Sequence, residues 1–136
     1  MTKLSLLSAA ALLLAGPAFA ADPATGEDLF KKCKACHSIV APDGTEIQKG
    51  GRTGPNLYGI MGRAVASDPD YTYGPSILAV GAAGKTWDAS ALSAYLADPA
   101  GWLKTETGDS AARSKMSFKL GSGGEDLAAY LASVVQ

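Results

Sequence analysis

The 136-residue chain is poor in the residues that bind metals or form disulfides. It contains two cysteines and one histidine. A zinc site needs about four ligands, so this set is too small for one. The chain also lacks an excess of positive charge, since 12 Lys and Arg residues face 13 Asp and Glu residues. Nucleic-acid binding is therefore not expected.

The chain has no obvious membrane-spanning segment near its start. The apolar run at residues 4–15 is shorter than the roughly 20 residues that cross a bilayer. It follows Lys3 and precedes a Gly-Pro pair and an A-x-A pattern ending at Ala20. We interpret residues 1–20 as a secretory signal peptide cleaved after Ala20, in preference to an uncleaved membrane anchor.

Cleavage would leave residues 21–136, which are 116 residues and enough for one compact domain. Of the 12 basic residues only Lys3 is lost, so 11 face 13 acidic residues and the formal charge is −2 before any cofactor. We expect a soluble periplasmic protein. An oxidising compartment makes a disulfide the first expectation for two cysteines.

The two cysteines and the histidine lie within five residues, as Cys33-Lys34-Ala35-Cys36-His37. This C-x-x-C-H pattern is that of c-type haem attachment. Two thiols three residues apart on one turn can each add to a vinyl group of a porphyrin, and the adjacent imidazole can then take an axial position on the iron. The pattern predicts one haem c attached through Cys33 and Cys36, with His37 as an iron ligand.

Two alternatives explain less of the same motif. A thioredoxin-like C-x-x-C would follow a strand–helix pattern, whereas the preceding residues 24–32 have a helical pattern. A plain disulfide between Cys33 and Cys36 would leave His37 without a role.

A second axial ligand cannot be another histidine or cysteine, because the sequence has none. The remaining candidates are Met61, Met116, a lysine or a weaker ligand. A sulfur ligand raises the reduction potential and occupies the position where a small ligand would bind. Such an iron is suited to outer-sphere electron transfer.

Two further segments follow the haem motif in a characteristic order. They are TGPNLYGIMGR at residues 53–63 and SKMSF at residues 114–118. With the haem motif, they resemble the class I c-type cytochromes, most closely the cytochrome c2 type of alphaproteobacteria. The resemblance implies an all-α cytochrome c fold, with about five short helices and long loops wrapped around one haem.

The resemblance also assigns the iron ligands. Met116 becomes the axial ligand opposite His37, and Met61 becomes a packing residue. The backbone carbonyl of Pro55 is expected to support the His37 imidazole. The tyrosine of the following helix, Tyr95, is expected to approach the methionine sulfur.

Other residues are implied to contact the haem propionates. These residues are Arg63, Tyr73, Trp87 and Ser114. Ser114 stands where the family usually has a threonine, and its hydroxyl can still donate a hydrogen bond. The connections at residues 41–52 and 104–113 are longer than in short mitochondrial-type chains, and their placement stays open.

Local signals predict where several helices begin and end. Asp22 followed by Pro23 indicates a helix start. Asp88 can cap a helix that runs through Tyr95 and stops before Pro99. Shorter helical pieces are expected at residues 56–61 and 75–80.

The last helix is expected to begin at a capping box. Ser122 and Glu125 have the required spacing of three residues. An apolar stripe follows, formed by Leu127, Tyr130, Leu131 and Val134.

Lysines surround the two haem-binding segments. They are Lys31, Lys32, Lys34, Lys104, Lys115 and Lys119. A positive ring around the haem edge would steer the protein towards acidic partners. We expect a monomer that carries electrons from a cytochrome bc1-type complex to a photosynthetic reaction centre or a terminal oxidase. The alternatives are a haem enzyme or gas-binding protein with an open sixth position, and a haem-free thiol–disulfide protein.

The long loops predict a fold that depends on the haem. The Cys33→Ala/Cys36→Ala double variant, produced without haem, should be largely unfolded because the haem supplies the centre of the core. Far-UV circular dichroism would measure this, with the haem-loaded parent as reference. Near-native helicity in a compact variant would contradict the prediction.

Overall fold

The structure is a computed structural model that describes residues 20–135. The predicted signal peptide, apart from Ala20, lies outside the described residues. The described part contains five helices: α1 (Pro23–Phe30), α2 (Pro75–Ala82), α3 (Ala89–Ala97), α4 (Pro99–Thr107) and α5 (Gly124–Ser133). Strands β1 (Ile39–Val40) and β2 (Glu46–Gln48) pair antiparallel. The predicted all-α class is confirmed.

Within residues 20–135, no helix has the length and apolar character needed to span a bilayer.

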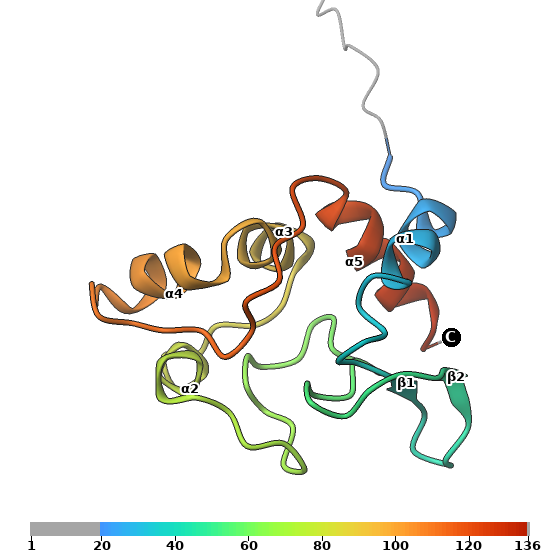
Figure 1. The fold of residues 1–136 in the computed structure, drawn as a ribbon, viewed down its shortest axis with the longest axis horizontal. Coiled ribbons are helices and arrows are strands. Elements are labelled where there is room, and N and C mark those ends of the chain that lie inside the picture. The colour runs from blue at the N-terminus through green and yellow to red at the C-terminus, as the bar shows by residue number, and fades with distance from the viewer. Residues whose placement is uncertain (1–19, 136) are drawn as a thin grey trace, which may run out of the picture.

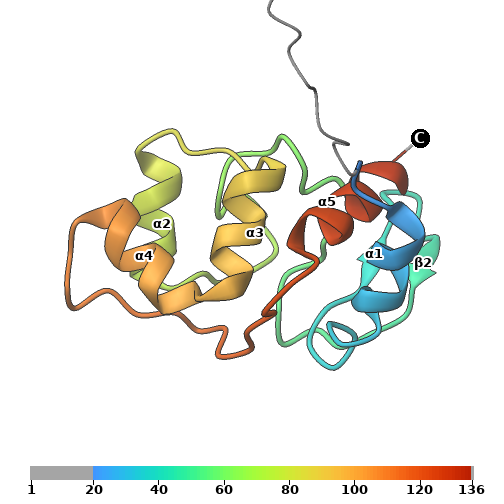
Figure 2. The same ribbon diagram turned by 90° about the horizontal axis from the view of Figure 1, so that it is seen from above.

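The helices form two neighbouring groups (Figures 1 and 2). Helices α1 and α5 cross each other, and α3 packs against α5. Helix α4 packs against both α3 and α2. The α1–α5 crossing is close because Gly26 has no side chain, and a Cβ atom there would collide with the backbone carbonyl of Asp126. Beside it, the rings of Phe30 and Tyr130 lie with centroids 5.9 Å apart.

Two predicted helix starts are confirmed. Asp22 caps α1 by accepting a hydrogen bond from the Ala24 N–H at 3.0 Å, and proline follows at the first helical position. Asp88 caps α3 by accepting from the Ala91 N–H at 2.7 Å. Helix α3 ends at Ala97, two residues before Pro99, as expected.

The predicted capping box at Ser122 and Glu125 is wrong. Helix α5 is capped by Gly123, which has a φ of +84° and provides no side-chain hydrogen bond. This left-handed conformation favours glycine. The next residue, Gly124, lies so close to Ser93 of α3 that a Cβ atom would collide with it. The helix start is therefore set by packing between helices. The expected apolar stripe is confirmed, since Leu127, Tyr130 and Leu131 are buried.

The predicted helix at residues 56–61 is also wrong, because this segment is irregular, with turns at residues 58, 59 and 61. The Asn56 amide donates to the Val40 carbonyl at 2.8 Å and accepts from the Val40 N–H at 3.0 Å. Its oxygen also accepts from the Tyr58 N–H at 3.1 Å, a local bond that competes with helix formation. The helix expected at residues 75–80 is present as α2.

The two long connections adopt different structures. Residues 41–52 form the β1–β2 hairpin and the chain after it, and Gln48 attaches β2 to α5 by donating to the Tyr130 hydroxyl at 2.7 Å. The connection at residues 104–113 is helical in its first part, which completes α4. Helix α4 ends at Thr107 and is capped by Gly108, whose φ is +67°.

Candidate haem site

A central cavity of about 490 Å³ brings the predicted haem-binding segments together. Cys33, Cys36 and His37 line it, and so does Met116. Much of its remaining wall is aliphatic, including Leu57, Ile60, Leu92, Leu96, Leu127 and Leu131. The cavity is therefore apolar enough for a porphyrin and carries the ligands at its wall.

The attachment segment is a tight turn directly after α1. The Cys33 carbonyl accepts hydrogen bonds from the Cys36 N–H at 3.1 Å and the His37 N–H at 2.9 Å. Cys33 is half-buried, Cys36 is exposed, and both are free thiols. Burial raises the pKa of the Cys33 thiol. The turn places both sulfur atoms and the imidazole at one cavity.

The His37 imidazole is held in the orientation that a metal ligand needs. Its Nδ1 lies 2.8 Å from the Pro55 carbonyl oxygen, which accepts the Nδ1–H hydrogen bond and leaves Nε2 free. Burial lowers the pKa of His37, although the bond to Pro55 opposes this shift. Gly54 lies against the ring so closely that any side chain there would collide with it.

The structure distinguishes the two methionines. Met116 lines the cavity, whereas Met61 packs against the buried core and does not line the cavity. The Met116 N–H donates to the Ser114 hydroxyl at 3.1 Å, and that hydroxyl lies 3.3 Å from the Tyr95 hydroxyl. Burial raises the pKa of Tyr95, and the bond to Ser114 acts in the opposite direction. Tyr95 thus contacts the ligand loop through Ser114.

Of the residues implied to contact the haem propionates, Tyr73, Trp87 and Ser114 line the cavity, whereas Arg63 does not. Arg63 lies beside the wall, since its carbonyl accepts a hydrogen bond from the Trp87 N–H at 2.9 Å. Burial raises the pKa of Tyr73, and a hydrogen bond to the Asp68 backbone and, less strongly, the Arg63 charge oppose this shift. The Nε of Arg63 is the one buried side-chain nitrogen or oxygen without a hydrogen-bond partner among the described residues. An unpartnered buried donor is costly, and a haem carboxylate is a fitting acceptor. The residues therefore fit haem c.

Contacts that the sequence did not reveal join three loops at the cavity wall. Lys115 donates to the Thr72 carbonyl at 2.7 Å, and its ammonium lies 5.9 Å from the centre of the Tyr71 ring. The Tyr71 hydroxyl donates to the Thr53 carbonyl at 3.1 Å. These contacts join residues far apart in the sequence, so no local spacing could have indicated them.

The predicted docking lysines occupy different surroundings. Lys32 and Lys115 line the cavity, and Lys34 lies within the attachment turn. Lys31 pairs with Asp28 at 2.7 Å, and Lys119 pairs with Asp98 at 2.9 Å. Lys104 lies in the last turn of α4.

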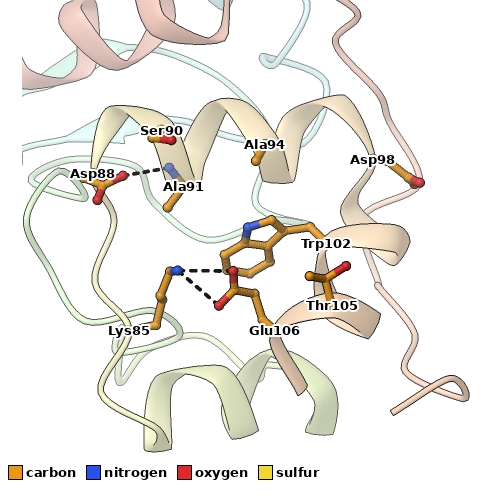
Figure 3. A pocket seen from close by; sticks show the side chains of 9 residues that line it. All are labelled: Lys85, Asp88, Ser90, Ala91, Ala94, Asp98, Trp102, Thr105 and Glu106. Carbon is orange, nitrogen blue, oxygen red and sulfur yellow. Dashed lines mark hydrogen bonds and ion pairs between the residues drawn. The ribbon is translucent and has the colours of Figure 1, made fainter. Parts of the chain in front are cut away.

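A second cavity of about 440 Å³ lies beside α3 and α4 (Figure 3). Its wall includes Lys85, Asp88, Asp98, Trp102 and Glu106. It has no cysteine, histidine or methionine in its wall, so it is separate from the haem-binding residues.

A helical fold that brings a C-x-x-C-H turn and a methionine to one apolar cavity defines a class I c-type cytochrome. The cytochrome c2 of Rhodobacter capsulatus is 55% identical to this chain, over 98% of this chain and 99% of that protein. Cytochrome c-550 of Paracoccus versutus is 53% identical, over 90% of this chain and 82% of that protein.

The solved structure of the Rhodobacter capsulatus cytochrome c2 matches with a TM-score of 0.82 and 54% identity, and the match covers 85% of this chain and 99% of that one. No family model matches the chain. The chain belongs to the cytochrome c2 family of class I c-type cytochromes. It is therefore an electron carrier with one covalent haem c, and not an enzyme.

Proposed function

We propose that this chain is a periplasmic one-electron carrier in which His37 and Met116 are the two axial ligands. The observation that carries the proposal is that Met116, and not Met61, lines the same cavity as His37. The bound haem supplies a reversible one-electron couple. A thioether at the sixth position favours the reduced iron and excludes small ligands, which favours electron transfer over ligand chemistry.

The remaining residues have supporting roles in this proposal. Cys33 and Cys36 anchor the haem by thioether bonds, which prevents its loss. Pro55 holds His37 through the 2.8 Å contact between its carbonyl oxygen and Nδ1. Ser114 and Tyr95 fix the backbone at Met116.

The polar residues Arg63, Tyr73 and Trp87 are proposed to donate hydrogen bonds to the propionates. The buried, unpartnered Nε of Arg63 supports this role, because Arg63 lies beside Trp87 of the cavity wall and lacks an acceptor for this donor. The position of Tyr73 and Trp87 in the cavity wall supports it for the other two.

Replacing Met116 tests the closed site. Met116→Ala should abolish the weak far-red absorption of the methionine–iron bond and allow the reduced protein to bind carbon monoxide, because the sixth position is opened. Met61→Ala is the matched control and should keep the band. A band that survives in Met116→Ala but vanishes in Met61→Ala would contradict the assignment. Carbon monoxide binding by the parent would instead favour an enzyme or gas-binding protein.

We further propose that partners dock at the lysines that flank the two haem-binding segments. Cys36 is exposed in the first of these segments, and Lys32 borders the haem cavity. The other members of the proposed docking surface are Lys31, Lys34, Lys104, Lys115 and Lys119. An acidic surface on a bc1-type donor, and on a reaction-centre or oxidase acceptor, fits this charge.

Charge removal tests the docking surface. Lys32→Gln should slow second-order electron transfer with a purified bc1-type complex roughly two- to fivefold at low salt, because steering is weakened. Stopped-flow rates measured over a range of ionic strength would show it. Thr45→Glu changes the net charge equally but lies in the exposed turn between β1 and β2, which carries none of the docking lysines, so it should have a smaller effect. Rates that are independent of salt would contradict electrostatic docking.

The location of the protein depends on the proposed signal peptide. Export should remove residues 1–20 and leave residues 21–136 as one domain. Mass spectrometry of the protein purified from the periplasm should therefore find Ala21 at the N-terminus. A mature protein that still contains Lys3 would contradict this proposal.

A further inference from the structure

Lys85 and Glu106 form an ion pair between two separate elements (Figure 3). Lys85 follows α2, Glu106 lies on α4, and the Nζ–Oε2 distance is 3.1 Å. Their side chains are 38% and 25% exposed, compared with 70% and 75% for Lys31 and Asp28. The pair is therefore screened less by solvent than an ordinary surface pair.

Lys85 is also the start of a short backbone ladder that leads to the haem site. Its carbonyl accepts from the Val65 N–H at 2.9 Å. Two residues later, the Trp87 N–H donates to the Arg63 carbonyl at 2.9 Å, and the Trp87 carbonyl accepts from the Gly62 N–H at 2.7 Å. The ladder fixes Arg63 and Trp87 next to each other.

A second connection runs through aromatic rings. The Lys85 ammonium lies 6.0 Å from the centre of the Trp102 ring. Trp102 in turn stacks on Trp87, with centroids 5.3 Å apart and planes 19° apart. Figure 3 shows Lys85 and Glu106 beside the Trp102 indole. The ion pair is thus connected to Trp87 in two ways, by the backbone that follows Lys85 and by the Trp102 ring that stacks on Trp87.

We infer that Lys85 and Glu106 are positioning residues that hold Arg63 and Trp87 in place to donate to the haem carboxylates. The inference rests on the proposed roles of Arg63 and Trp87. Neither Lys85 nor Glu106 lines the haem cavity, so their effect would pass through the ladder and the stacked indoles. Loss of the pair would loosen both donors and leave carboxylate charge less compensated. That uncompensated negative charge favours the oxidised protein, so the reduction potential falls.

The direction in which the reduction potential shifts distinguishes a positioning role of the ion pair from a direct effect of its charges on the iron. Removing a positive charge by Lys85→Met lowers the potential by either route. Removing a negative charge by Glu106→Met raises the potential if only charge matters, but lowers it if the pair positions the donors. We expect both variants to change the equilibrium constant for reduction about two- to tenfold in the same direction, where tenfold is about 59 mV for one electron.

Nitrogen-15 NMR provides a readout that does not depend on the iron potential. The Arg63 Nε–H and Trp87 indole N–H resonances of the reduced haem-loaded protein should shift in both variants. Lys85→Arg keeps the charge and a donor for Glu106, so it should retain the parent potential and resonances. This conservative variant also separates loss of the pair from a general failure to fold.

Asp28→Asn is the matched control, because it removes the same charge as Glu106→Met from an exposed ion pair at the end of α1. It should leave both resonances unchanged. Potentials that move in opposite directions in Lys85→Met and Glu106→Met, with unchanged Arg63 and Trp87 resonances, would overturn the inference. The methionine–iron band would persist in that outcome, so the proposed closed electron carrier would still stand.

Discussion

The fold depends on filling a cavity that its own helices surround. Aliphatic side chains from α3, α5 and the loop at residues 57–60 line a space of about 490 Å³. Left unfilled, this space would expose these aliphatic side chains to water, and apolar surface contributes to stability only when it is removed from water. The helices span only 8 to 10 residues, and isolated helices of this length are marginal in water. The covalent haem is therefore part of the core as well as the redox centre.

The attachment turn at residues 33–37 and the loop at residues 51–55 are hydrogen-bonded to each other. The Gly51 N–H donates to the Lys34 carbonyl and the Gly54 N–H to the Cys36 carbonyl, both at 2.8 Å. These bonds place the backbone of residues 51–54 directly against the attachment turn, and Pro55 then reaches His37. Gly54 is needed because the imidazole fills the space that a side chain would take. The two motifs that are separated in the sequence are thus two sides of one ligand site.

The sequence predicted what local chemistry determines. Asp22 and Asp88 begin helices because each cap is complete within three residues, and residues 33–37 carry an attachment pattern that needs no distant partner.

Prediction from the sequence failed where packing between distant segments determines the local structure. Gly123 replaces Ser122 as the cap because the chain adopts a left-handed conformation there, close against Leu29 of α1. Asn56 binds Val40, 16 residues away, in place of starting a helix. Residues alone also left Met61 and Met116 as alternatives, since only the fold shows which one reaches the cavity. The Lys85–Glu106 pair, 21 residues apart, has no periodic signal at all.

Several lysines around the site combine structural bonds with surface charge. Lys115 uses one of its N–H donors in the hydrogen bond to the Thr72 carbonyl, which connects the loop at residues 114–118 to the loop that contains Thr72. An ammonium has three donors, so two remain for a partner carboxylate. Lys119 likewise holds Asp98 at 2.9 Å while its side chain stays 59% exposed. Lysines fixed in this way have less side-chain freedom left to lose when they dock, which lowers the entropic cost of association. A carrier that must bind and release quickly benefits most from charges that are already positioned, because they speed encounter more than they strengthen the complex.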